Sequence, residues 1–321
     1  MTKKRILAYT VVIILLLATI FIAMATGSIK ASPSEIFSLI IGHKNPNALA
    51  ILDLRFPRII IAILVGGAFS VSGLLLQTTL KNPLIDPSLI GVSGGASLML
   101  YLGLFISSSA VIYKSFLAII GGIIGYLIIY LLSKNIKNNI TIILIGIAIS
   151  SFFTGILTAI NYVQNSNPSM NRASLGMKSW QDVNLLLIWV PIMLIISIIL
   201  AKACNIFFLD DEVVNSLGVN ISLLRAIISL VAVILASVAT SIVGVVAFLS
   251  LIAPHIAKII VGKNHFYSIP FCALVGSFIF LAFDTIGRTI VSPIEIPADI
   301  LMLIVGGPFF LFLIKRGVAY E

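Results

Sequence analysis

The stretch NIFFLDDEVVNSLGVNISLLR, residues 205–225, is a polar segment with long apolar segments on both sides, and it divides the chain. Three consecutive acids at 210–212 suit the positive N-terminal end of a short helix, and Gly218 is a natural residue to end that helix. Asn220 can cap a second helix that runs into the next apolar segment. We expect two short helices outside the bilayer, a shape that a partner protein can hold; an ordinary solvated loop is the alternative.

The composition places most of the chain in lipid. Of 321 residues, 60% are hydrophobic and 10% are charged, and the mean hydropathy is +1.20, which is more apolar surface than a soluble domain can bury. The net charge of +9 is not a nucleic-acid signal, because Lys and Arg lie at segment ends, where the positive-inside rule and lipid head groups favour them. Cys204 and Cys272 are interpreted as small core residues, and no metal site or cofactor is expected.

Hydropathy predicts an all-α, polytopic membrane protein of about ten transmembrane helices. The predicted spans are 6–25, 59–80, 89–108, 115–133, 140–163, 185–204, 226–246, 247–261, 268–290 and 299–314. Both ends of the chain are basic, and an even number of spans returns the C-terminus to the side of the N-terminus, so both termini are expected in the cytoplasm. Residues 28–58 and 164–184 would then be external, and 205–225 would be cytoplasmic.

The order of the spans predicts an internal repeat. After the first span, four spans precede the external stretch 164–184 and four follow residues 205–225, so the two sets enter the membrane from opposite sides. Such inverted repeats are common in transport proteins. The spacings from Gly91 to Gly95 and from Gly121 to Gly125 are G-x-x-x-G patterns, which let helices approach closely. A closely packed bundle fits a transporter or channel better than a simple anchor.

Few groups within the spans can carry chemistry. Asp284 is the only acid well inside an apolar segment, and Arg288 follows one turn later, at the spacing at which the two can pair. A proton-driven carrier usually needs a relay of such groups, and an intramembrane enzyme needs a catalytic set that the sequence does not offer. The sequence also has no G-x-x-x-x-G-K-[ST] motif, so ATP bound through a P-loop would belong to another chain.

Three arginines are expected at the external face. Arg55 and Arg58 flank Pro57 just before the second span, and Arg288 lies near the external end of the ninth. Because the guanidinium group suits bidentate pairing with carboxylates, these arginines could receive the carboxylates of an external partner. Arginines that snorkel to the membrane interface are the alternative.

Several motifs along nearly the whole chain resemble those of FecCD-type permeases, the membrane subunits of type II ABC importers for iron-siderophore, haem and cobalamin uptake. They are LRFPRIIIAILVGGAFSVSGLLLQTTLKNPLIDPSLIGVSGGAS (54–97), EVVNSLGVN (212–220), FLSLIAPHIAKIIVG (248–262), and DTIGR with EIPADILMLIVGGPFFLFLIKR (284–316). Ser250 stands where the family pattern has a glycine, Asp210 where a glycine is common, and MKSWQDV (177–183) lacks the usual G-S-L.

The resemblance implies a single transmembrane permease domain over residues 1–321, in the type II ABC importer permease fold. This subunit would lie in a bacterial cell membrane, surrounded by lipid, and would pair with a second copy or a paralogue around a translocation path. Two ABC ATPase subunits would bind on the cytoplasmic side and a substrate-binding lipoprotein outside. The expected cargo is an iron(III)-siderophore or a related iron chelate; haem and cobalamin are alternatives within the family, and an ion-coupled secondary transporter is a further alternative.

The resemblance also assigns roles to residues. The segment 205–225 resembles the coupling helices that sit in a cleft of the ATPase, whereas Arg55, Arg58 and Arg288 match external arginines that meet glutamates of the binding protein. The expected ATPase-coupling residues are Asp211, Glu212, Ser216, Leu217, Gly218 and Val219.

Overall fold

The computed structural model describes residues 3–26, 51–106, 113–133, 139–163, 175–176, 178–216, 218–291 and 294–315, and these residues form helices and turns without a strand. The elements are α1 (Lys3–Ala25), a π-helical turn η1 (Ile51–Arg55), α4 (Phe56–Thr79), α5 (Val92–Ile106), α6 (Lys114–Ser133), α7 (Asn139–Val163), α8 (Trp180–Ile199), α9 (Ala201–Ile206), α10 (Asp211–Ser216), α11 (Ile221–Val243), α12 (Leu249–Val261), α13 (His265–Thr289) and α14 (Ala298–Lys315).

The helices confirm the predicted class of protein. In the described part of the chain, seven helices are long and apolar enough to cross a membrane, and α5, α12 and α14 are shorter apolar helices. Together they account for the ten predicted spans, with α9 continuing the sixth beyond Leu200. The fold is therefore an all-α, polytopic membrane protein.

Two helices begin five residues earlier than hydropathy predicts, and a capping group explains each start. The side chain of Asn220 accepts a hydrogen bond from the amide of Leu223 at 3.0 Å, so α11 begins at Ile221. The amide of Ser179 donates to Asp182 Oδ2 at 3.0 Å, so α8 begins at Trp180. Residues 180–184, which we expected outside the membrane segments, are therefore the first turn of α8.

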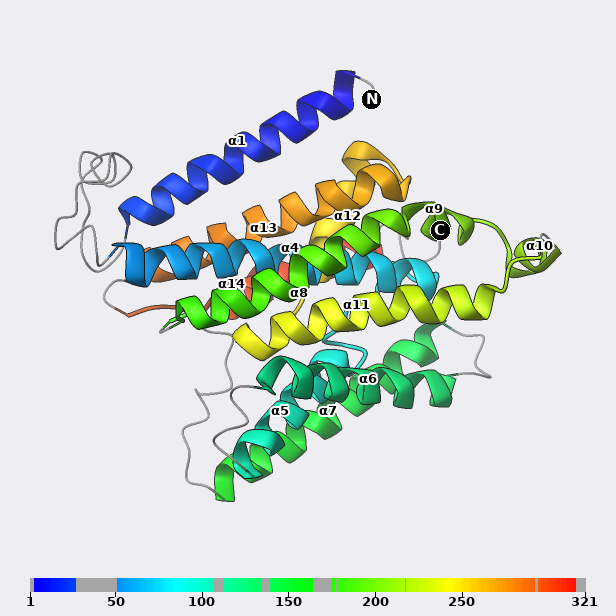
Figure 1. Cartoon of the computed structure of the whole chain (residues 1–321), viewed down its shortest axis with the longest axis horizontal. Coiled ribbons are helices and arrows are strands. Elements are labelled where there is room, and N and C mark those ends of the chain that lie inside the picture. The colour runs from blue at the N-terminus through cyan, green and yellow to red at the C-terminus, as the bar shows by residue number, and fades with distance from the viewer. Residues whose placement is uncertain are drawn as a thin grey trace.

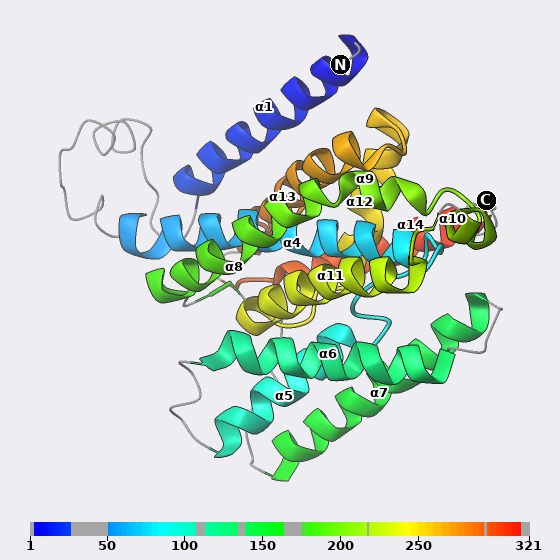
Figure 2. The same cartoon turned by 45° about the vertical axis from the view of Figure 1, so that its right-hand side comes forward.

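The two sets of four helices share one packing pattern. α4 and α11 lie side by side at the centre and run in opposite directions (Figures 1 and 2). α4 packs on α8, α12 and α13, and α11 packs on α8, α5 and α6. α5 pairs with α6 as α12 pairs with α13, while α7 and α14 pack on the outside of these pairs. Exchanging α4–α7 for α11–α14 leaves this pattern unchanged, as the predicted inverted repeat requires.

Glycines bring the helix backbones into direct contact. The two predicted G-x-x-x-G motifs face each other across α5 and α6, because a Cβ atom at Gly95 would overlap the carbonyl of Gly121 and one at Gly125 would overlap that of Gly91. A Cβ atom at Gly66 of α4 would lie 2.5 Å from the carbonyl oxygen of α13 residue Gly276. The absence of a side chain at these glycines therefore lets the facing helices approach closely.

The bundle has two distinct ends. The beginning of α1, the end of α14 and the short helix α10 lie at one end in both views, whereas the beginning of α4 and the end of α13 lie at the other (Figures 1 and 2). This arrangement separates the expected coupling segment 205–225 from the three expected docking arginines by the length of the bundle.

Candidate coupling and docking sites

The coupling segment 205–225 contains the predicted short helix. α10 begins at Asp211, with two acids in its first turn. Gly218 has a φ of +76°, the left-handed region that glycine adopts without strain, and its amide donates to the Asn215 carbonyl at 3.0 Å. Leu217 lies outside the described residues. The second predicted short helix is the first turn of α11 itself, with no break between them.

α10 presents most of its surface to solvent. Glu212, Asn215, Ser216 and Gly218 are exposed and Val219 is half-buried, whereas Val214 is fully buried. The exposed side chains of this segment therefore remain available to a partner protein.

Asp211 fastens α10 to the bundle through two cations. Its Oδ1 lies 2.7 Å from Lys81 Nζ, just beyond α4, and its Oδ2 lies 3.0 Å from NH2 of Arg225, in α11. Lys81 also donates to the Leu209 carbonyl at 2.8 Å. Burial raises the pKa of Asp211, but the hydrogen bonds from Lys81 and Arg225 outweigh it and hold the pKa below its ordinary value. α10 is therefore connected to both central helices, and no local sequence pattern indicates the role of Lys81.

A buried histidine makes a second connection at this end. His265, at the start of α13, is 1% exposed. Its Nε2 lies 2.7 Å from Thr78 Oγ1 in α4, and its Nδ1 lies 2.9 Å from Asn205 Oδ1 in α9. Asn205 Oδ1 also accepts the His265 backbone amide at 2.9 Å. Asn205, the first residue of the coupling segment, is thus hydrogen-bonded to the start of α13. No local sequence pattern indicates this contact.

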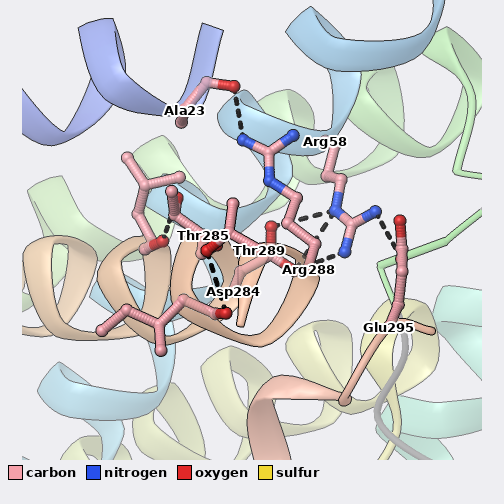
Figure 3. A network of polar contacts seen from close by, with 9 residues as sticks. Ala23, Arg58, Asp284, Thr285, Arg288, Thr289 and Glu295 are labelled. Atoms are coloured by element: carbon pink, nitrogen blue, oxygen red, sulfur yellow. Dashed lines mark hydrogen bonds and ion pairs between the residues drawn. The ribbon is translucent and has the colours of Figure 1, made fainter. Parts of the chain in front are cut away.

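At the opposite end, Arg58 is held by two carboxylates (Figure 3). Its Nε lies 2.9 Å from Asp284 Oδ2 and its NH2 lies 2.8 Å from Asp284 Oδ1, which is a bidentate pair. Its NH1 lies 2.9 Å from Glu295 Oε2. The side chains of Arg58 and Asp284 are 14% and 4% exposed, whereas that of Glu295 is 43% exposed. Only the Glu295 contact is open to water.

The other two arginines secure the end of α1. Arg55 and Arg288 are 8% and 6% exposed. Arg55 donates to the backbone carbonyl of Met24, and Arg288 donates to that of Ala23 (Figure 3). Carbonyls in the last turn of a helix lack intrahelical partners and attract cations. The expected pair of Asp284 with Arg288 is replaced by the pair with Arg58, because the guanidinium group of Arg288 reaches α1 instead.

A third polar cluster lies inside the bundle. Asp86, in the turn between α4 and α5, is fully buried and accepts hydrogen bonds from the Ser88 amide at 2.7 Å, from the Phe248 amide at 3.2 Å and from the Ser250 hydroxyl. Phe248 has a φ of +65°, which is unusual for a bulky residue. The departure from the family pattern at Ser250 is thus a serine whose hydroxyl helps to satisfy a buried carboxylate.

The profile of the FecCD transport family matches residues 15–316, and the chain belongs to this family. It is 39% identical over 314 residues to a protein of Staphylococcus aureus strain Newman named as a probable heme-iron transport system permease protein, IsdF, covering 97% of this chain and 96% of that one. The IsdF protein of the bovine strain RF122 is 38% identical over the same length.

The fold is also that of a solved transporter. A structure described as the inward-facing conformation of an ABC transporter of metal-chelate type superimposes with a TM-score of 0.81, at 26% identity, over 97% of this chain and 99% of that one. The chain is therefore a multi-pass permease of a cell membrane with the ABC importer permease fold, as the sequence motifs predicted.

Proposed function

We propose that this chain is the membrane subunit of an ATP-driven importer of an iron chelate and that it hydrolyses no ATP itself. The observation that supports the proposal most is the attachment of α10: its solvent-facing side chains are free for a partner, while Asp211 ties it to Lys81 and Arg225. A short helix joined to both central helices can transmit movement from another protein. Two ABC ATPase subunits would supply that movement, and residues 1–321 would form one permease domain.

The same proposal places α10 and both termini in the cytoplasm. The start of α1, the end of α14 and α10 lie at one end of the bundle (Figure 1), and basic residues at the chain ends favour the cytoplasmic side. Asp211, Glu212, Ser216, Leu217, Gly218 and Val219 would contact the ATPase.

In this mechanism the ATPases act by shifting a conformational equilibrium. When ATP closes them, they would push α10, and Asp211 would pass the displacement to α4 and α11, which switch the bundle between outward-open and inward-open states. The cargo needs only a difference in affinity between these states, so the permease need not bind it strongly. Capture of the cargo would fall to an external binding lipoprotein.

Docking of that lipoprotein would exchange one carboxylate for another. Glu295 is the exposed partner of Arg58, so a glutamate of the binding protein can replace it without disturbing the buried pair of Arg58 with Asp284. Arg288 Nε is buried without a hydrogen-bond partner among the described residues, so it would receive a second carboxylate once docking moves the end of α1 aside. Arg55 would complete the docking set.

The docking proposal is tested in proteoliposomes with the binding protein. The variant Glu295→Gln should raise its affinity severalfold, because Arg58 is released, and Arg58→Glu should abolish docking. Asp53→Asn, which removes an exposed acid at the same end, serves as the matched control. Unchanged affinity in both Glu295→Gln and Arg58→Glu would remove the proposal.

The permease would pair with a second copy of itself or with a paralogue. α14 exposes large apolar side chains, among them Leu303, Ile304 and Leu311, which lipid or a partner permease would cover. Light scattering of the purified chain should give twice the monomer mass if it pairs with itself. A monomer that dimerises only when a paralogue is co-expressed would indicate a heterodimer.

The cargo is proposed to be an iron chelate, with haem and an iron(III)-siderophore as the two candidates. The relative named for heme-iron transport favours haem, and no observation favours cobalamin. Thermal stabilisation of the co-purified binding protein by haem, by hydroxamate and catecholate chelates and by cobalamin would separate these cargoes. Uptake into vesicles should require ATP and the ATPases; uphill uptake by the isolated chain would instead establish a secondary transporter.

A further inference from the structure

A cavity of about 400 Å³, open to the surface along one side, lies between three helices at the α10 end of the bundle. It is lined by Ile6, Thr10 and Ile13 of α1, Ile198 of α8, and Phe266 and Pro270 of α13. This volume is within the range of ordinary ligand sites, about 300–1,000 Å³. The cavity is remote from the arginines at the other end and involves no residue assigned to coupling.

Two hydroxyl donors that line this cavity are already engaged. The Thr10 hydroxyl donates to the Ile6 carbonyl at 3.0 Å, and the Tyr9 hydroxyl donates to the Tyr267 carbonyl at 2.7 Å. The remaining lining is hydrocarbon or aromatic ring, and Ile6, Ile13 and Phe266 are exposed at its open side. An apolar chain therefore fits the cavity, whereas a polar solute would find no free hydroxyl donor among these two groups.

Arg5 fixes the geometry beside this cavity. Its Nε donates to the Val261 carbonyl at 3.0 Å, and its guanidinium carbon lies 4.4 Å from the centre of the Tyr267 ring. These contacts hold the start of α1 against α12 and α13. The cavity therefore lies beside helices that contact one another.

The charges around the cavity all have one sign. Lys3 lies one turn before Ile6, Lys202 lies four residues after Ile198, and Lys263 lies three residues before Phe266. All three lysines are exposed and have no ion-pair partner in the described ranges. Moreover, the sequence has no Asp or Glu within 3–26, 183–209 or 249–283.

We propose that this cavity binds an anionic phospholipid, with an acyl chain between α1 and α13 and the phosphate beside Lys3, Lys202 and Lys263. The lysines select the headgroup, since basic pockets between transmembrane helices attract anionic lipids. The apolar lining alone would not discriminate between lipids, because any acyl chain satisfies it. The site would secure α1, the helix whose end Arg55 and Arg288 hold at the other side of the bundle.

Native mass spectrometry of the purified chain tests this site with phosphatidylglycerol and phosphatidylcholine of identical acyl chains. The wild type should bind phosphatidylglycerol more tightly than phosphatidylcholine. In the double variant Lys202→Gln/Lys263→Gln the ratio of the two affinities should be lower by about tenfold or more, because each lysine contributes a factor of about five. Lys315→Gln, an exposed lysine at the end of α14, should keep the preference. An equal preference in the double variant and the wild type, or an equal loss in Lys315→Gln, would overturn the proposal.

A second variant tests the apolar half of the site without changing its charge. Thr10→Phe fills the cavity and should reduce the retention of both lipids, with thermal stability in lipid-free detergent as the check on folding. Soluble glycerol 1-phosphate should not bind at the concentrations at which phosphatidylglycerol saturates. If Thr10→Phe retains both lipids, or if glycerol 1-phosphate competes as well as the lipid, the acyl chain has no part in binding and the proposal is wrong.

Discussion

At the α10 end the ion pairs of Asp211 are partly exposed to water, whereas at the opposite end the pair of Arg58 with Asp284 lies almost entirely inside the protein. The Asp211 and Lys81 side chains are 42% and 36% exposed, against 14% and 4% for Arg58 and Asp284. Exposed pairs are weak and screened by salt, while breaking a buried pair leaves an uncompensated charge. The contrast suits a movable attachment at one end and a fixed one at the other.

The largest effect is expected from breaking the buried pair. Asp284→Ala should destabilise the protein by about 3–5 kcal/mol, because Arg58 keeps its charge and retains only Glu295. The measurement is the free energy of unfolding in detergent. The double variant Arg58→Met/Asp284→Leu should recover most of the lost stability, since it removes both charges. If the double variant is as unstable as Asp284→Ala, an unpaired Arg58 is not the cause of the destabilisation.

Gly218→Val should have the next largest effect. A β-branched residue at a φ of +76° is strained by about 1–2 kcal/mol, although a Cβ atom there would meet nothing within 4 Å. Uptake with the ATPases should therefore fall while membrane insertion is kept. Gly218→Asn, which tolerates this φ, is the matched control and should retain most of the uptake; normal uptake in Gly218→Val would argue against a coupling role.

Asp211→Asn should cost less than about 1 kcal/mol of stability, because the pairs it breaks are partly exposed and screened by water. Transport should fall more than stability does, since α10 loses its connection to Lys81 and Arg225. The measurement is ATP hydrolysed per cargo molecule transported. Asp210→Asn, an adjacent exposed acid with no ion pair in the described residues, is the control, and equal effects of the two variants would contradict the role of Asp211.

The smallest effect is expected from pH. Because the folded pKa of Asp211 is lowered, its contribution to stability is fully present above its ordinary pKa of about 4 and is lost as pH falls through the folded pKa. A spin label at Ser216→Cys should therefore show constant mobility from about pH 5 to 8 and greater mobility only in stronger acid. Greater mobility already at about pH 6 would mean that another group fastens α10.

The elements that local sequence determines were predicted well. Apolar length identifies the spans, and the acids at 210–212, Gly218 and Asn220 correctly predicted α10 and the cap of α11. The start of α8 is also determined locally, because Ser179 and Asp182 form an S-x-x-D capping pattern.

The partners of charged residues were not predictable in the same way. Asp284 and Arg288 satisfy the one-turn spacing, but Asp284 pairs with Arg58, 226 positions away, because the packing of α4 on α13 brings the two together. The cluster around Asp86 likewise joins turns 162 residues apart through Phe248. Side-chain spacing gives the candidates, and tertiary packing selects among them.

The contact of Gly66 with Gly276 makes the bundle sensitive to a single methyl group. Alanine is ordinarily the mildest replacement, yet at Gly66 its Cβ would lie 2.5 Å from a backbone oxygen of the facing helix. The variant Gly66→Ala therefore reports on the distance between α4 and α13. If these helices move apart at any stage of the transport cycle, Gly66→Ala will trap the protein in the state with the larger distance.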